Sequence, residues 1–537
     1  MSSTSSSPVL STDQDNESAA IQEIIRLMYA GGLSNRKELE VAKRDVAVRF
    51  GLKRYLPTSE IIRKAPEEVK ERFRSLLSVR PQRSGSGIVV ITLFSAPFLC
   101  PHGTCIFCPG GPKDGTPQSY LPDGPGMRVA LDANFDSYLQ ARRGIKKFRD
   151  RGHSVSKVEL ILEGGTFIAT PPDYQYSFVK GAYEGLNGTR SKDLEEAQMV
   201  NETALSRAVG LTIESKPDWC RPNDIDLMLS YGVTRLEIGV QSLRNDILKR
   251  SNRGHTVEDT INAFQVSRDA GLKVGAHMMP GLPASDYDRD LEDLRRLFED
   301  EAFKPDMLKI YPTVVVKGTA LAKMYLAGRY EPYERDTVVE LLSEMKRNVP
   351  RWVRIMRIQR EIPKHELVAD SCGESLRESV RKRALEKGIR CRCIRCREVA
   401  LSEPESIPEN FLFRQEEYTA SGGSEVFCSY ESETTERIAG FIRMRYPSEN
   451  AHRTEVKGAC IIRELRVYGR SVPVGVRNDQ AWQHKGIGSR LLTLMEEVAV
   501  SKFGVNKMVI TSAVGTREYY RRLGYGREGP YMSKRLD

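Results

Sequence analysis

Three cysteines lie close together in the segment FLCPHGTCIFCPGG, at positions 100, 105 and 108. Proline and glycine surround them, so the segment is expected to be a loop. Among common metal centres, thiolates select zinc and iron–sulfur clusters. A structural zinc ion takes four ligands, and only His102 lies near enough in sequence to join Cys100, Cys105 and Cys108. A 4Fe–4S cluster held by three thiolates instead leaves one iron open for a ligand, and this interpretation is favoured.

A second group of cysteines stands in the segment CRCIRC, at Cys391, Cys393 and Cys396, among four arginines. Neighbouring positive charge makes thiols easier to deprotonate, which suits a metal ligand. Zinc is the expected ion, and the alternative is a reactive or exposed cysteine cluster. A fourth ligand would come from elsewhere in the chain, with three candidates: Cys372, Cys428 and Cys460. Cys220 has no partner nearby and is expected to be a small buried side chain.

A glycine-rich turn, QHKGIG at residues 483–488, opens an amphipathic helix after a loop. Backbone N–H groups at a helix N-terminus bind anions, and glycine lets a pyrophosphate approach closely. The strand-like run 464–467 precedes this turn, and Tyr519 and Tyr520 follow it. Aromatic core packing is expected for one of these two tyrosines.

The elements that must position these groups alternate between short apolar strands and helices from about residue 85 to 360. Six strands are expected, at residues 87–94, 157–163, 211–215, 235–240, 273–279 and 307–312. Such alternation predicts a parallel sheet covered by helices, here an α/β partial barrel of (β/α)6 type. Reactive groups of barrels gather at the C-terminal strand ends. Those ends carry Gly164, Gly165, Glu214, Gln241 and the turn 280–283.

Five regions are expected along the chain. Residues 1–18 are Ser-rich and polar, and are predicted to be a disordered tail. Residues 19–84 read as a basic helical region, 85–370 as the barrel, 371–409 as a basic cysteine-containing linker, and 410–537 as an α+β domain.

The chain has 537 residues and a formal net charge of +10. Its positive charge gathers in three blocks, at residues 36–83, 142–151 and 377–397. Each block alone could be a solvated helix face, but three together favour a nucleic-acid partner. No apolar run approaches the roughly 18 residues of a membrane span. The N-terminus lacks secretory features, so a cytoplasmic protein with reduced cysteines is expected.

These motifs carry a resemblance. A three-cysteine loop after the first barrel strand resembles the radical S-adenosylmethionine (SAM) superfamily, although the spacing here is C-x4-C-x2-C instead of the more usual C-x3-C-x2-C. The segments LEGGTF, TIESKPDWC, RLEIGVQS, NRGHTVEDT, HMMPGLP and LKIYPTVV together resemble the family of the Elongator catalytic subunit, including stand-alone archaeal or bacterial types. The C-terminal third resembles a GNAT acetyltransferase. The similarity runs from about residue 20 to the C-terminus.

The resemblance implies roles for individual residues. Cys100, Cys105 and Cys108 match the ligands of the 4Fe–4S cluster, whose open iron binds SAM. Gly164, Gly165, Glu214 and Gln241 fall where such enzymes contact SAM. Tyr520 or Tyr519 matches the acid beside the acetyl-CoA sulfur. The residues that match the acetyl-CoA site are Lys157, Glu464, Leu465, Arg466, Val467, Gln483, Lys485, Gly486, Ile487, Gly488, Ser489 and Tyr520.

The implied reaction joins the acetyl group of acetyl-CoA to C5 of the wobble uridine of tRNA, forming 5-carboxymethyluridine with a 5′-deoxyadenosyl radical from SAM. The implied partner is the tRNA anticodon stem-loop, with or without Elongator-type subunits. One alternative is a protein lysine acetyltransferase whose cluster is only structural, but an open iron beside polar strand ends would serve no purpose there. The other is an RNA-binding module with a degenerate site, which the joint presence of the cysteines, the glycine turn and the tyrosines disfavours.

Overall fold

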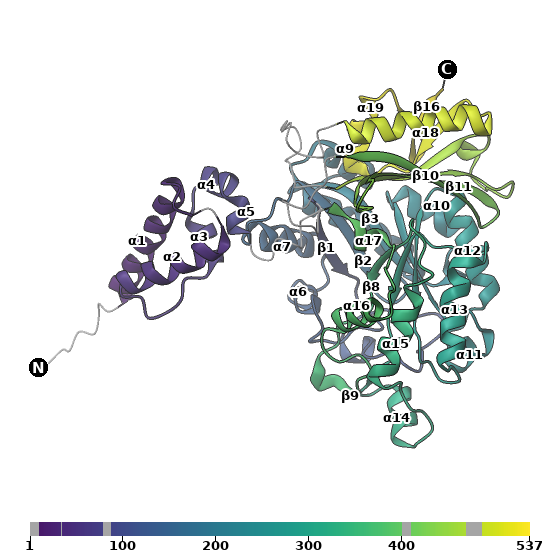
Figure 1. Ribbon diagram of the computed structural model, residues 1–537, viewed down its shortest axis with the longest axis horizontal. Helices are drawn as coiled ribbons and strands as arrows, with labels where there is room; N and C mark the ends of the chain where they lie inside the picture. The colour runs from purple at the N-terminus through teal and green to yellow at the C-terminus, as the bar shows by residue number, and fades with distance from the viewer. Residues whose placement is uncertain (1–9, 34, 79–86, 400–409, 469–485, 537) are drawn as a thin grey trace, which may run out of the picture.

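The computed structural model describes residues 10–33, 35–78, 87–399, 410–468 and 486–536. Figure 1 shows a separate body of N-terminal helices, a central barrel and a C-terminal sheet at the top of the view. None of the helices in these ranges has the length and apolar character needed to cross a membrane.

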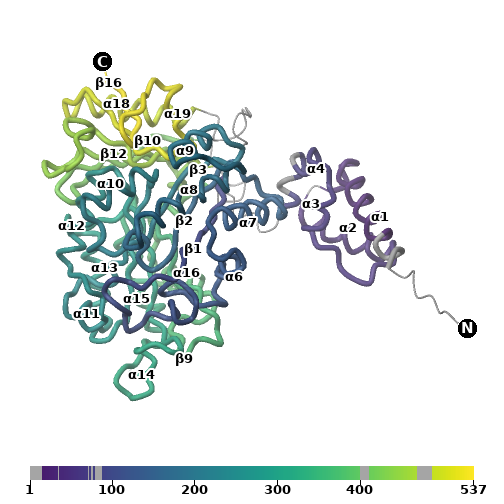
Figure 2. Tube along the Cα trace, turned by 180° about the vertical axis from the view of Figure 1, so that it is seen from behind, coloured from purple at the N-terminus to yellow at the C-terminus, as the bar shows by residue number. Residues whose placement is uncertain are grey.

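The N-terminal helices form a body with its own apolar core. They are α1 (Leu10–Tyr29), α2 (Arg36–Arg49), α3 (Thr58–Lys64), α4 (Glu67–Arg72) and α5 (Arg74–Leu77). The prediction of a disordered tail over residues 1–18 is wrong from Leu10 onward, because α1 begins there; residues 1–9 lie outside the described ranges. The helix continues into the apolar stripe of Ile21, Ile24 and Met28, which is buried against the other helices. Ser78 at the end of this body donates a hydrogen bond to the Gly152 carbonyl, which follows α7 (Ser137–Arg149) of the barrel. Figure 2 shows from behind that the N-terminal body lies next to α7.

The barrel is a sheet of seven parallel strands in the order β1-β2-β3-β4-β5-β6-β8. The strands are β1 (Val89–Phe94), β2 (Lys157–Glu163), β3 (Arg207–Ser215), β4 (Arg235–Gln241), β5 (Lys273–Met278), β6 (Met307–Ile310) and β8 (Arg354–Arg357). All six expected strands are present. The seventh, β8, was not predicted, because RIMR is short and half of it is arginine.

Helices surround this sheet. They are α6 (Met127–Leu131), α7 (Ser137–Arg149), α8 (Pro172–Asn187), α9 (Leu194–Thr203), α10 (Pro222–Ser230), α11 (Asn245–Arg250), α12 (Val257–Asp269), α13 (Tyr287–Glu299), α14 (Ala320–Leu326), α15 (Arg335–Met345), α16 (Leu376–Glu386) and α17 (Ile394–Arg397). A small antiparallel pair, β7 (Val315–Val316) and β9 (Leu367–Ala369), lies outside the main sheet.

The C-terminal domain is a mixed sheet in the order β10-β11-β12-β13-β14-β16-β15. Its strands are β10 (Phe411–Ala420), β11 (Gly423–Ser432), β12 (Ile438–Tyr446), β13 (Cys460–Val467), β14 (Lys507–Ile510), β15 (Gly526–Glu528) and β16 (Tyr531–Arg535), and its helices are α18 (Ile487–Phe503) and α19 (Arg517–Arg521). The domain sits over the ends where the barrel strands begin: a Cβ at Gly515 would lie 2.6 Å from the Cβ of Arg207, the first residue of β3.

Buried ion pairs join the two domains. Arg463 of β13 donates two hydrogen bonds to Asp306, at 2.6 and 2.7 Å, just before β6. Arg463 also bonds Glu425 at 2.7 Å, and Arg445 bonds Asp269 of α12 at 2.6 Å. All five side chains are buried. Because an unpaired buried charge is costly, these pairs fix the C-terminal sheet on the barrel.

Candidate functional site

A cavity of about 360 Å³ opens at the C-terminal ends of the barrel strands. Cys100, Cys105 and Cys108 line it together with residues from the ends of β2, β3 and β4. The cysteine loop reaches this position because it follows β1 directly. The structure thus brings the first cysteine group and the expected strand-end residues to one place, as the barrel prediction required.

The cysteine sulfurs accept hydrogen bonds from the cavity wall. Arg253 donates to the Cys105 sulfur at 3.3 Å, and the Gln118 amide donates to the Cys108 sulfur at 3.4 Å. His102 Nε2 lies 3.1 Å from the Cys105 sulfur. Burial lowers the pKa of His102 to about 4, helped by the nearby cations Lys216 and Arg253. Burial raises the pKa of the Cys100 thiol and raises that of Cys108 to about 11, so a bound metal centre would have to supply the positive charge that favours their thiolate forms.

The spacing of the sulfurs distinguishes the two metal centres considered from sequence. In the described part of the chain, the groups of three or more ligand atoms within 4.8 Å of one another do not include Cys100, Cys105 and Cys108. A single zinc ion holds its sulfurs at about 2.3 Å and therefore close together. The wider spacing fits the larger 4Fe–4S cluster.

The strand-end residues expected to contact SAM have different surroundings. Gly165, Glu214 and Gln241 line the cavity. The buried side-chain oxygen of Gln241 has no hydrogen-bond partner in the described ranges, so it offers an acceptor to a ligand. Gly164 has φ 151°, and a Cβ there would lie 2.0 Å from the Ser95 hydroxyl, so close packing alone explains glycine at this position.

Ion pairs run through the interior of the barrel, a feature that the sequence interpretation missed. Arg235 bonds Glu159 at 2.5 Å and Glu237 at 3.2 Å, and Lys309 bonds both Glu237 and Glu214, the latter at 3.2 Å. Barrel interiors are ordinarily packed with branched apolar side chains. The signal was present, since charged residues alternate along β2 and β4. This row of ion pairs extends from the strand starts to the cavity. The cavity wall includes Glu214 and Glu237.

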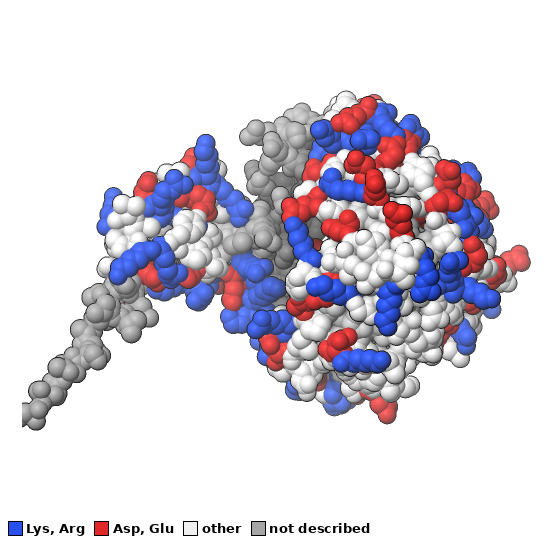
Figure 3. Space-filling model, turned by 90° about the horizontal axis from the view of Figure 1, so that it is seen from below, with Lys and Arg blue, Asp and Glu red and all other residues white. Residues whose placement is uncertain are grey.

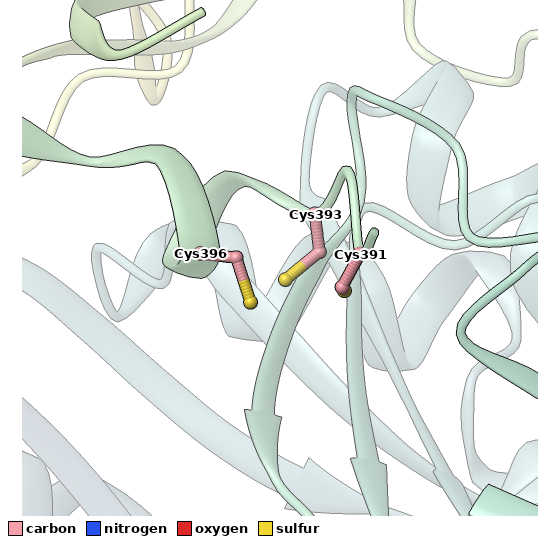
Figure 4. Close-up of side chains that lie close together, drawn as sticks. All are labelled: Cys391, Cys393 and Cys396. Atoms are coloured by element: carbon pink, nitrogen blue, oxygen red, sulfur yellow. The ribbon is translucent and has the colours of Figure 1, made fainter. Parts of the chain in front are cut away.

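The second cysteine group is assembled as expected. The sulfurs of Cys391, Cys393 and Cys396 lie within 4.8 Å of one another, and Figure 4 shows the three side chains converging before and on α17. Hydrogen bonds from Cys391 and then Cys396 hold the pKa of the Cys393 thiol well below its usual range. Three sulfurs at this spacing fit a tetrahedral zinc ion.

None of the three candidate fourth ligands joins this group. Cys428 and Cys460 are buried in the core of the C-terminal sheet, and Cys372 is buried in the core of the barrel. The ligand atoms gathered within 4.8 Å in the described residues are those of the three cysteines alone. Cys220 is buried in the barrel core, as predicted.

The C-terminal sheet has an opening between two parallel strands. β13 and β14 pair from Cys460 to Ile462, and beyond that, among the described residues, β13 continues to Val467 paired with β12 alone. Within the described part of the chain, the backbone of residues 464–467 therefore has an open edge on its other side. A cavity of about 100 Å³ lies there, lined by Glu464, Leu465, Arg466 and Tyr520 together with residues from barrel strand starts. An extended amide-containing arm could pair with the open strand edge.

Three residues expected at the acetyl-CoA site, Glu464, Tyr519 and Tyr520, differ in burial and in their contacts. Glu464 bonds Arg443 at 2.9 Å and is buried, which leaves its backbone as the part open to a ligand. Tyr520 is buried, and burial raises its pKa; Tyr519 is 40% exposed, and burial of its remainder raises its pKa as well. Their rings meet edge to face at 5.1 Å. Tyr519 and Tyr520, one expected to be the acid and the other a packing partner, are therefore in direct contact.

The glycine turn is described only from Gly486. Gln483 and Lys485 lie outside the described ranges. Gly486 precedes α18 with φ 71°, and Ile487, Gly488 and Ser489 form its first turn. A Cβ at Gly488 would lie 2.9 Å from the Tyr519 hydroxyl, so glycine allows the tyrosine to approach the helix start.

Lys157 begins β2, at the end of the barrel that faces the C-terminal domain. Its register partner on β3 is Arg207, which contacts Gly515. Burial lowers the pKa of Lys157. The thiol-lined cavity lies at the opposite ends of the same strands.

Basic side chains gather where the N-terminal body meets the barrel, as Figure 3 shows from below. Arg143 and Lys147 of α7, from the second basic block, also line the wall of the thiol-lined cavity. Part of the first block is neutralised, because Arg54 bonds Glu17 and Glu60, and Lys43 bonds Glu40. The exposed basic residues of α2 remain available to a polyanion.

Comparisons with known proteins agree with this layout. Four family models match: the ELP3 N-terminal domain at residues 17–85, the radical SAM superfamily at 98–298, the radical SAM C-terminal domain at 305–386 and the GNAT acetyltransferase family at 394–525. The tRNA uridine(34) acetyltransferase of Methanocaldococcus jannaschii is 41% identical over 96% of this chain and 97% of its own length. Human Elongator complex protein 3 is 39% identical over 93% of each chain. The solved structure of Methanocaldococcus infernus Elp3, which lacks N-terminal residues, matches with a TM-score of 0.75 and 40% identity over 84% of this chain and all of that one.

Proposed function

This chain belongs to the family of tRNA uridine(34) acetyltransferases and Elongator complex protein 3, and on this premise we propose that it modifies the wobble uridine of tRNA. The product we propose is 5-carboxymethyluridine, with acetyl-CoA as the carbon source. The observation that carries the proposal is the presence, in one chain, of a thiol-lined cavity at barrel strand ends and an open strand edge in an acetyltransferase sheet.

The three sulfurs and the unpaired Gln241 acceptor fit a 4Fe–4S cluster and SAM, so Cys100, Cys105 and Cys108 would hold the cluster. Gly165, Glu214 and Gln241 would contact SAM from the cavity wall. When bound to a reduced cluster, SAM supplies a 5′-deoxyadenosyl radical that removes hydrogen from unactivated carbon. This chemistry suits uridine C5 and an acetyl methyl group, neither of which reacts readily by acid–base steps alone.

The acetyl-CoA site would use the open edge of β13 and the start of α18. The backbone of residues 464–467 would pair with the pantetheine arm, and Gly486 and Gly488 would let the pyrophosphate approach helix N–H groups. Tyr520, which faces the gap, would protonate the departing CoA thiolate. Lys157 would attract the CoA phosphates from the barrel as a point charge.

The proposed polyanionic partner is the anticodon stem-loop of tRNA. The exposed basic residues of α2 and the basic wall of the cavity support this choice. We further propose that the protein acts in the cytoplasm and binds a zinc ion at Cys391, Cys393 and Cys396. All ten cysteines are free, which agrees with a reducing compartment. Whether the chain acts alone or with Elongator-type subunits is open to test by purification from its source.

The test is nucleoside mass analysis of tRNA incubated anaerobically with the protein, SAM, a reductant and acetyl-CoA. We expect 5-carboxymethyluridine only when all four are present. Transfer of acetyl groups to protein lysines without any change in tRNA would instead establish the protein acetyltransferase alternative.

A further inference from the structure

Glu163 differs from Glu214 and Glu237, two other strand carboxylates that line the thiol-lined cavity; the fourth carboxylate there, Glu361, is exposed to solvent. Glu163 ends β2 and lines the cavity. Glu214 is bonded to Lys309 and to the Tyr120 hydroxyl, and Glu237 is bonded to Lys309 and Arg235. Within the described ranges, the Glu163 carboxyl has neither a hydrogen bond nor an ion pair. Its oxygens are not among the fully buried unpaired atoms of the described residues, so they are open to the cavity and can accept a hydrogen bond or a proton from a ligand.

The surroundings of Glu163 make its carboxyl a weak acid. The charged groups that face it are Glu214 of β3, Glu237 of β4, Lys309 of β6 and Arg357 of β8. The Tyr120 ring approaches from the loop after the cysteines. Burial, followed by repulsion from Glu214, raises the pKa of Glu163 to about 7, against the attraction of the two cations. A base of this strength both accepts and releases a proton near neutral pH.

The other basic groups of the cavity are less suited to accept a proton from a substrate. His277 is bonded to Glu237 at 3.0 Å, and His102 lies against the Cys105 sulfur. Arg253 donates a hydrogen bond to the same sulfur. In the described part of the cavity wall, Glu163 thus offers a carboxylate lone pair that no other residue occupies, in the same cavity as the cysteine sulfurs.

We propose that Glu163 is the base that takes the proton from C5 of the uridine. This inference rests on the function proposed above. In that reaction one methyl hydrogen of the acetyl group leaves with the 5′-deoxyadenosyl radical, a bond forms between the methyl carbon and C5, and the C5–H bond breaks; water then hydrolyses the thioester and CoA departs. The C5 hydrogen leaves as a proton to the Glu163 carboxylate, and the odd electron of the adduct passes to a one-electron acceptor of the iron–sulfur class. Glu163 then releases its proton to solvent, so it returns to its starting state.

The test compares the wild type with Glu163→Gln, Glu163→Asp and the control Glu361→Gln. Glu361 is an exposed carboxylate at the same cavity, near Arg357. We expect Glu163→Gln to lower the rate of 5-carboxymethyluridine formation by about 100-fold or more, the usual range for general bases. Formation of 5′-deoxyadenosine and tRNA binding should stay within about twofold in every variant, and Glu361→Gln should match the wild type.

A second measurement separates proton removal from a structural role. With tRNA that carries deuterium at C5 of the wobble uridine, Glu163→Asp should show a larger isotope effect than the wild type, because loss of the C5 proton becomes the slow step. The wild-type rate should rise with pH through about 7, the pKa of this carboxyl, and Glu163→Gln should lose that rise.

Three results would overturn the inference. They are modification by Glu163→Gln within about threefold of the wild-type rate, an isotope effect that does not change in Glu163→Asp, and loss of SAM cleavage in parallel with loss of product. If the wild type itself makes no 5-carboxymethyluridine, the proposed function fails, and this inference fails with it.

Discussion

Replacing Glu163 by glutamine should stabilise the protein at alkaline pH even when no substrate or cluster is present. The pKa of Glu163 is raised from 4.5 to about 7 in the folded state, chiefly by burial. Between these values the folded protein holds a proton that the unfolded chain has lost. The stabilising contribution is therefore complete below about pH 4.5 and is lost as pH rises through about 7. Glutamine cannot ionise and escapes that loss.

The magnitude follows from the pKa difference, at about 1.4 kcal/mol for each tenfold change. At pH 8 the free energy of unfolding of Glu163→Gln should exceed that of the wild type by about 3 kcal/mol. At pH 5 most wild-type molecules still hold the proton, so the difference should fall below about 1 kcal/mol.

The assay is urea-induced unfolding of cluster-free protein at the two pH values, with Glu361→Gln as the control. Glu361 is exposed, so its replacement should give no pH-dependent gain. Equal stability of Glu163→Gln and the wild type at pH 8 would refute the environment assigned to this carboxyl. A larger gain at pH 5 than at pH 8 would do the same, because it would mean that the folded state favours the charged form.

The remaining predictions concern the other sites. Cys105→Ala should lose iron, brown colour and SAM cleavage while acetyl-CoA affinity in calorimetry is retained, and SAM cleavage by the variant would contradict the cluster assignment. Cys393→Ser should reduce bound zinc, measured by mass spectrometry, from about one ion per chain to near zero, whereas unchanged zinc would place the ion elsewhere. Tyr520→Phe should slow tRNA-dependent release of CoA by about tenfold to a hundredfold, whereas Tyr519→Phe should release CoA at close to the wild-type rate. If Tyr519→Phe is instead the slower variant, Tyr519 is the acid. The last variant removes four exposed positive charges of the N-terminal body, by Arg36→Gln, Lys37→Gln, Arg44→Gln and Lys53→Gln. It should bind tRNA more weakly and with a smaller salt dependence. An unchanged salt dependence would show that the tRNA contacts another surface.

The sequence predicted the barrel strands because each is a short apolar run between turn-forming residues. It also predicted that the cysteine loop and the strand-end residues meet, since parallel strands end at one edge of the sheet. β8 could not be predicted, because a four-residue strand with two arginines has no apolar pattern. The sequence pattern does not single out Glu163 for a related reason. The residue ends an apolar strand, and only the alternation along β2, which puts Glu159 and Glu163 on one face, indicates a polar interior.

The contact between the domains could not be predicted from the sequence. Periodicity shows which face of a strand is buried but not which domain covers it. The arginines that fix the interface, Arg445 and Arg463, stand in strands where a charged residue would ordinarily face solvent. Both are buried against acidic residues of the barrel, Asp269 and Asp306. Only the folded chain reveals that these residues are internal.

The contact between the domains puts the two proposed sites at opposite ends of the barrel strands. The gap beside β13 lies at the strand starts, whereas the cysteine cavity lies at the strand ends, and β1 to β5, which have six to nine residues, span about 20–30 Å. The barrel interior between them holds the ion pairs of Arg235 with Glu159 and of Lys309 with Glu237. Parting the two domains would be costly, because it would separate the buried charges of Arg463 and Asp306. If acetyl-CoA binds beside β13 and the cluster binds at Cys100, Cys105 and Cys108, as proposed, the acetyl group has to travel between opposite ends of the barrel strands before it meets the uridine.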